Sequence, residues 1–291
     1  MALRSYPLII MMHGLTHGID FNDPYVKVWF FGVPISYLVL AGLFRLLGWW
    51  NFKLKVMKNK KLQDSTTRAS DDMAFEIVAG FCVTYLAAAG FIGSYSLFGV
   101  NDFPKLEANP FYGDSQFVRN HLIYPMIFFQ GWNVVLCLFL EVLRSPEMIA
   151  HHLVTASLAY LGMHPYLHLR GLYFLGIAEV TNIPLTVYDV LKKFERLGWK
   201  EGKLYEITQA AFAISFIVFR LIIWPYYCIP FWLGSIDLIR TGKAHSNFVV
   251  VYFLLSNVFL TGLQLLWGQQ IVVGLLQVLG IVKKKTSKKA P

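Results

Sequence analysis

The sequence has 291 residues, of which 56% are hydrophobic and only 15% are charged, with a formal net charge of +9. A soluble globule of this size needs more polar residues for its surface, so the composition excludes a soluble protein and predicts an all-α, multi-pass membrane bundle. The positive charge is concentrated in a few segments, which indicates membrane topology and excludes nucleic acid as a partner.

Seven apolar stretches are long enough to cross a bilayer, which takes about 20 residues per helix. We predict spans over residues 28–50, 74–98, 121–143, 148–168, 171–191, 207–234 and 248–280. Trp224, Pro225 and Pro230 predict a kink or an interfacial end in the sixth span, and residues 58–72 are predicted to form a polar linker. The predicted domains are a lumenal segment, the membrane bundle and a basic cytosolic tail, over residues 1–27, 28–280 and 281–291.

Basic residues alternate among the segments that join the predicted spans. The segments after the first, third and fifth spans and the tail are basic, whereas the other connecting segments are poor in Lys and Arg. The positive-inside rule then places the amino terminus outside and the carboxyl terminus in the cytosol. Lys288 and Lys289 resemble a dilysine retrieval signal, so we expect the protein in the endoplasmic-reticulum membrane.

Two adjacent histidines, His151 and His152, begin the fourth predicted span. Ionisable side chains inside a membrane are rare and costly, which makes this pair the main candidate for a functional site. Thr155 lies about one helical turn beyond His151 and shares its helix face. Glu141, near the cytosolic end of the third span, is predicted at the depth of His151, where its carboxylate can orient an imidazole.

The fifth predicted span carries a polar stripe that is expected to face the bundle and not lipid. Glu179 is followed by Asn182, Thr186 and Asp189 after three, seven and ten residues, which is helical spacing. Arg220, in the sixth span, is predicted at the depth of Glu179. An unpaired charge at that depth costs about 2.5–3.5 kcal/mol, so we expect the two side chains to pair. The stripe and the histidines are predicted to line one cytosol-facing cavity without a metal.

The His-His-x-x-Thr pattern of residues 151–155 resembles the opening of the signature motif of ceramide synthases, which belong to the TLC domain family. Arg170 and Gly171 stand, without a spacer, where those enzymes have Arg-x-Gly. The resemblance covers about residues 70–280. It implies a seven-helix bundle and a lipid-lined cavity with the histidine pair at its cytosolic end.

Ceramide synthases have an aspartate pair where this chain has Glu179 and Asn182. The chain is therefore more similar to the non-synthase TLC domain proteins, and two functions stay open. In the first, the protein acts in membrane lipid homeostasis by binding or handling acyl lipids. In the second, it is an acyltransferase of ceramide-synthase type, in which cytosolic acyl-CoA meets His151 or His152 as nucleophile or general base. Membrane lipids or acyl chains are the expected partners, and no cofactor is expected.

Two other classes agree less well with the sequence. A membrane di-iron desaturase needs clustered imidazoles. The chain has two His-x-x-x-His pairs, beginning at His13 and His164, and the second is predicted at the membrane face opposite His151. A channel or a seven-helix receptor is disfavoured because no segment resembles a selectivity filter and the polar stripe is short and one-sided.

Overall fold

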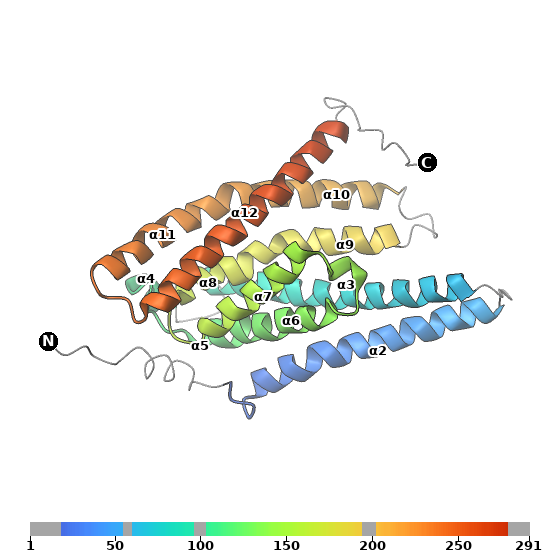
Figure 1. Ribbon diagram of the computed structural model, residues 1–291, viewed down its shortest axis with the longest axis horizontal. Coiled ribbons are helices and arrows are strands. Elements are labelled where there is room, and N and C mark those ends of the chain that lie inside the picture. The colour runs from blue at the N-terminus through green and yellow to red at the C-terminus, as the bar shows by residue number, and fades with distance from the viewer. Residues whose placement is uncertain (1–18, 55–59, 96–102, 194–201, 279–291) are drawn as a thin grey trace.

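The computed structural model describes residues 19–54, 60–95, 103–193 and 202–278 (Figure 1). Every regular element within these ranges is a helix. The longer helices are α2 (Pro24–Leu54), α3 (Lys60–Tyr95), α6 (Tyr124–Leu136), α7 (Pro146–Leu161), α9 (Asn182–Lys193), α10 (Lys203–Phe216), α11 (Trp224–Arg240) and α12 (Asn247–Val278). The short α-helices are α4 (Phe103–Ala108), α5 (Gln116–Val118) and α8 (His168–Gly171). The π-helical segments are η1 (Arg119–Ile123), η3 (Leu172–Gly176) and η7 (Ile217–Ile223), and the 3₁₀ segments are η2 (Glu141–Leu143) and η4 (Ile177–Thr181).

Five helical stretches of the described chain are long and apolar enough to cross a membrane. They are Pro24–Leu47, Ser70–Tyr95, His168–Lys192, Lys203–Arg240 and Asn247–Leu276. The protein is thus a multi-pass helical membrane protein, as predicted. The third and fourth of the seven predicted spans are not among these five. They correspond to the hairpin of α6 and α7, and α7 has only 16 residues, or about 24 Å at 1.5 Å per residue.

The chain turns between α7 and α8 earlier than predicted. The sequence places the break at residues 169–170, but α7 ends at Leu161 and the next helix begins at His168. Leu167 takes a left-handed conformation with φ of 64°, which reverses the chain direction just before α8. Arg170 is therefore helical, partly buried and directed at a cavity, whereas the sequence placed it in a loop.

The predicted polar linker over residues 58–72 is wrong from residue 60 onward, because α3 already begins at Lys60. A helix can continue through a polar segment when its side chains bond to those of a neighbouring helix. Arg45 of α2 supports this extension with two hydrogen bonds to the Asp71 carboxylate, at 2.8 and 2.7 Å. The described part of the predicted linker, from Lys60 to Asp72, is thus helical.

The long helices lie roughly side by side, and their ends gather at two ends of the bundle (Figure 1). The carboxyl ends of α2, α9 and α12 and the amino ends of α3 and α10 lie at one end. The connection between α11 and α12 lies at the other, together with α4 and α8. The helix ends that flank the basic segments after the first and fifth predicted spans therefore share one end of the molecule.

Two glycines set the distance between α3 and the helix that carries the polar stripe. A Cβ added to Gly90 would lie 2.7 Å from the Cα of Gly176 and 2.5 Å from the backbone nitrogen of Ile177. Backbones can approach this closely only where both side chains are hydrogen atoms, as is common between membrane helices. The contact holds η3 and η4 against α3 and so positions Glu179.

Candidate functional site

The helical stretch His168–Lys192 changes its winding twice before the polar stripe is complete. It passes from the π-helical η3 to the 3₁₀ η4 at Gly176, whose φ of −116° and ψ of −86° lie outside the helical range. Pro184 has no N–H for the carbonyl four residues earlier, which removes one bond of the regular ladder. Glu179 and Thr181 consequently lie in a tightly wound turn, a common place for functional side chains.

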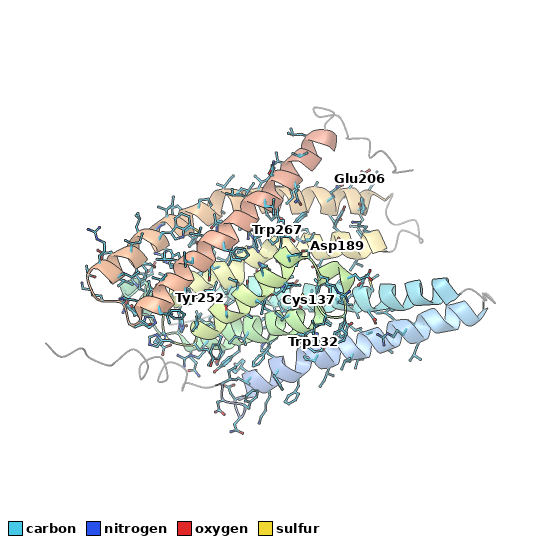
Figure 2. All side chains as sticks on the ribbon, viewed as in Figure 1. Trp132, Cys137, Asp189, Glu206, Tyr252 and Trp267 are labelled. Carbon is cyan, nitrogen blue, oxygen red and sulfur yellow. The ribbon has the colours of Figure 1, made fainter. Side chains whose placement is uncertain are left out.

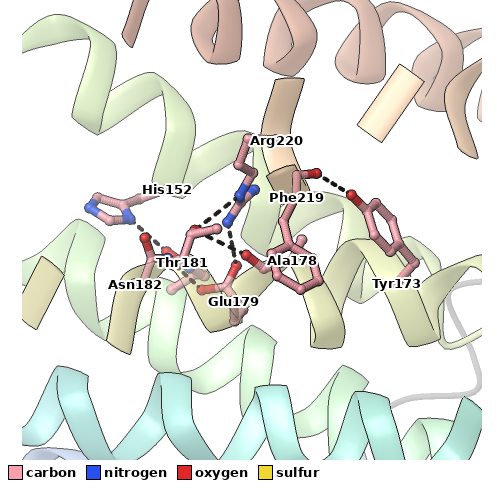
Figure 3. A network of polar contacts seen from close by, with 9 residues as sticks. His152, Tyr173, Ala178, Glu179, Thr181, Asn182, Phe219 and Arg220 are labelled. Carbon is pink, nitrogen blue, oxygen red and sulfur yellow. Dashed lines mark hydrogen bonds and ion pairs between the residues drawn. The ribbon is translucent and has the colours of Figure 1, made fainter. Parts of the chain in front are cut away.

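Arg220 lies at the centre of a second irregular segment, the π-helical η7. Pro225 follows directly and cannot donate to the carbonyl of Leu221 four residues before it, so the regular bonding pattern is interrupted here. The hydroxyl of Tyr173 donates to the carbonyl of Phe219 in this widened turn (Figure 3). Arg220 in this irregular segment points toward η4, where its guanidinium contacts Glu179 and Thr181.

Glu179 and Arg220 form a buried ion pair, as predicted from their equal depth. Nη2 of Arg220 lies 3.4 Å from Oε1 of Glu179, and only 7% and 8% of the two side chains are exposed. The second carboxylate oxygen accepts from Nδ2 of Asn182 at 2.7 Å. Nε of Arg220 donates to the Thr181 hydroxyl at 3.3 Å (Figure 3). The guanidinium also lies 5.6 Å from the ring of Trp224, so both charges have several partners.

The two histidines differ in how they are held. Nδ1 of His152 lies 2.5 Å from Oε1 of Gln130, and since the amide oxygen can only accept, this nitrogen carries the proton. The other nitrogen of His152 is therefore an acceptor. It is buried and has no hydrogen-bond partner among the described residues, and the same holds for Nδ1 of His151 and the hydroxyl of Thr155. The ring of His151 lies edge-on to Trp267 at 5.7 Å.

A cavity of about 420 Å³ brings the predicted residues together. Its polar lining includes Gln130, His151, His152, Glu179, Asn182, Thr186, Asp189, Arg220 and Gln264. Apolar side chains complete the wall, among them Phe75, Val83, Phe129, Phe212 and Phe216. Figure 2 shows Trp267 on α12 and Asp189 on α9, both of which line this cavity. The histidine pair and the polar stripe share one cavity, as predicted; their roles in function stay predictions.

A second, smaller cavity of about 80 Å³ adjoins the first. It is lined by Thr155, Arg170 and a set of apolar side chains. Four lining residues are common to both cavities, namely His151, Glu179, Arg220 and Gln264. The ion pair therefore lies on the boundary between the larger cavity and the smaller one.

Glu141 does not join the other predicted site residues. It is exposed in η2, and it lines neither the larger nor the smaller cavity. The prediction that it orients a histidine is not supported, because the chain forms a 3₁₀ turn after α6 and directs this side chain outward. The amide of Gln130 holds His152 instead.

Sequence reasoning missed five buried polar residues at the site: Glu76, Gln130, Asn133, Thr181 and Gln264. Their exposed fractions are 6%, 3%, 2%, 0% and 2% respectively. They come from four different helical stretches, so no single helix carries the whole pattern. A signal was nevertheless present, because a neutral amide inside a membrane span also needs a polar partner.

The family model TRAM_LAG1_CLN8, described as the TLC domain, matches residues 73–273. This range covers more than half of the chain and includes every residue of the two cavities. The chain has no significant match among curated proteins or among solved structures. On this match, and with the helical bundle already described, the chain belongs to the TLC domain family.

Proposed function

We propose that the protein handles acyl lipids in the larger cavity and so acts in membrane lipid homeostasis. The observation that carries this proposal is the composition of the cavity wall. Aromatic and aliphatic side chains can enclose an acyl chain, and polar groups gathered around Glu179 and Arg220 can bind the polar part of the same molecule. A membrane protein meets such amphipathic molecules in the bilayer that surrounds it.

The bonding of Glu179 favours lipid handling over catalysis. A catalytic imidazole that acts as a base is a stronger base when a carboxylate accepts from its second nitrogen, because the negative charge stabilises the protonated ring. Here the Glu179 carboxylate bonds to Arg220 and Asn182, and His152 is held by the neutral amide of Gln130. The geometry therefore supports binding of a ligand more directly than activation of an imidazole.

One observation favours the second candidate function, an acyltransferase that uses acyl-CoA. His151 and His152 each have a buried ring nitrogen that no described residue bonds to, and both residues line the larger cavity. Such a nitrogen can take a proton from an amine or hydroxyl acceptor, or attack a thioester carbonyl. Release of free CoA thiol by the purified protein, dependent on acyl-CoA and an acceptor, would support this candidate.

Filling the larger cavity tests the lipid-handling proposal. Val83 lines the cavity and is 4% exposed, so Val83→Trp is expected to occupy space that an acyl chain needs. We expect crosslinking to a diazirine-labelled phosphatidylcholine in membranes to fall about tenfold, equivalent to about 1.4 kcal/mol of binding. Val258→Trp is the matched control, because Val258 is 54% exposed on α12 and lines neither cavity.

The proposal is wrong if the Val83→Trp protein elutes as a folded monodisperse species and is crosslinked as well as the wild type. Equal loss in the Val258→Trp control would also contradict it, since that change leaves the cavity intact.

We also propose that the protein resides in the endoplasmic-reticulum membrane with its basic segments in the cytosol. Two features support this proposal. The helix ends that flank two of the basic segments lie at one end of the bundle (Figure 1), and cytosolic loops are enriched in Lys and Arg. Lys288 and Lys289, which lie outside the described residues, match a dilysine pattern.

A tag at the carboxyl terminus is expected to be digested when protease is added to sealed microsomes. A tag at the amino terminus is expected to be protected until detergent is added. The reverse pattern would show that the topology inferred from the basic segments is inverted.

A further inference from the structure

The smaller cavity is lined by a cation, Arg170, that has no counter-ion among the described residues. Arg170 of α8 lies against the ring of Phe111, with 5.4 Å between the guanidinium carbon and the ring centroid. Its only hydrogen bond within the described chain runs from Nη1 to the carbonyl of Tyr227, and at 3.4 Å it is long. Nε is buried and has no partner there. Most of the donors of this guanidinium are therefore free to bind a ligand.

The acidic groups near the smaller cavity are already engaged. Glu179, which lines the same cavity, is bonded to Arg220 and Asn182. Asp114 lies at this end of the bundle but forms an ion pair with Arg119. Among the described residues no carboxylate lies within ion-pair distance of Arg170.

His168, the other titratable side chain of α8 in this cavity, is also fully bonded. Its Nδ1 accepts from the backbone N–H of Ser115 at 3.1 Å, and its Nε2 donates to the carbonyl of Gly162 at 2.8 Å. These two bonds require a neutral imidazole with its proton on Nε2. His168 therefore supports the turn before α8 and, unlike Arg170, has no ring nitrogen free for a ligand.

We propose that Arg170 binds the oxyanion head of a lipid, a carboxylate or a phosphate, at the end of the bundle opposite the basic segments. The guanidinium offers parallel N–H donors that match two oxygens of either group. The proposal deepens the proposed lipid-handling function and rests on it, because it states the chemical class of the lipid and the direction of its head.

The walls of the smaller cavity fit the part of such a lipid that follows the head. Phe174, Leu175, Trp224, Phe231 and Leu260 line it. Its volume of about 80 Å³ suits a head group and the adjoining carbons better than a whole acyl chain. The chain can continue toward the larger cavity, because the two cavities share lining residues around the ion pair.

The position of Arg170 in the chain agrees with a head-group site. Arg170 lies in the first turn after the connection between α7 and α8, and α8 lies at the bundle end where α11 joins α12 (Figure 1). Glu179 is nine residues further along the same helical stretch, roughly 14 Å deeper at 1.5 Å per residue. Arginine near a helix end can reach the lipid head groups, whereas the deeper Arg220 needs its own carboxylate.

Binding of matched charged and neutral lipids to the full-length protein in nanodiscs tests the proposal. The probes are oleate with oleyl alcohol, and dioleoyl phosphatidate with dioleoylglycerol. We expect the wild type to bind at least one charged probe about tenfold more tightly than its neutral partner. Arg170→Gln should abolish this preference and leave binding of the neutral probes unchanged, and Arg170→Lys should retain part of it. Arg240→Gln, an exposed change at the end of α11, should behave as the wild type.

Preference for oleate alone would identify a carboxylate head, for phosphatidate alone a phosphate head, and for both a general oxyanion site. A wild type without any preference would overturn the proposal, as would an Arg170→Gln protein that keeps the preference. The oxyanion site and the lipid-handling function can fail separately. If the wild type shows no charge preference but Val83→Trp loses binding of the neutral lipids, the oxyanion site is rejected and the lipid-handling function is retained. Failure of every probe to bind the wild type would reject both.

Discussion

Replacing Glu179 with alanine is expected to destabilise the folded protein by about 3–5 kcal/mol, because Arg220 would remain buried without its counter-ion. The Arg220 side chain is 7% exposed, and its remaining described partners, the hydroxyl of Thr181 and the ring of Trp224, are neutral. A neutral hydroxyl and an aromatic face cannot replace a carboxylate in an apolar bundle. Thermal unfolding of the purified protein in detergent, followed by loss of the monodisperse species, measures the effect.

The double variant Glu179→Ala, Arg220→Met separates loss of packing from loss of charge balance. It removes both charges, and we expect it to recover most of the stability lost in Glu179→Ala, since an apolar pair of similar volume is often as stable as a buried ion pair. Asp71→Ala is the matched control. It breaks the Arg45–Asp71 pair, in which Arg45 is 52% exposed, and should cost less than about 1 kcal/mol. If Glu179→Ala costs no more than this control, the buried pair does not stabilise the bundle.

Alanine at His151 and alanine at His152 are each expected to abolish function but to differ in their effect on stability. Both residues line the larger cavity, so a null cell line expressing either variant should keep the altered lipid profile of the null. His151→Ala should leave expression close to wild type, because Nδ1 of His151 has no described hydrogen-bond partner to lose. His152→Ala leaves the Gln130 oxygen unpaired in a buried site, which costs about 1–3 kcal/mol.

The measurement is a lipid profile of the rescued cells beside the amount and thermal stability of the expressed protein. His121→Ala is the matched control, since His121 bonds to Tyr85 and lines neither cavity; this variant should rescue the profile. Full rescue by both the His151→Ala and His152→Ala proteins would show that the histidine pair is not part of the functional site. Loss of expression in the His151→Ala protein would point to a structural role.

The hydropathy pattern of the sequence was sufficient to predict that the protein is a helical membrane protein. It was also sufficient to predict that Glu179 and Arg220, which lie deep in the bundle, form a pair. Apolar stretches of membrane length predict helices, because every backbone polar group in the bilayer must bond within its own segment. The ion pair between Glu179 and Arg220 was also predictable, since depth can be counted along two neighbouring spans and an unpaired charge at that depth is costly. The polar stripe that ends at Asp189 was predictable for a related reason, because its four members follow one helical period.

Tertiary structure alone decided how the site is assembled. The turn before His168 depends on a left-handed Leu167, which hydropathy does not encode. The amide of Gln130 replaced Glu141 as the partner of His152 because α6 ends in a short turn that directs Glu141 outward. Arg170 became part of a cavity because residues 168–171 are helical and not a loop. Each of these outcomes depends on contacts between segments distant in the chain, and such contacts leave no periodic signal in a single helix.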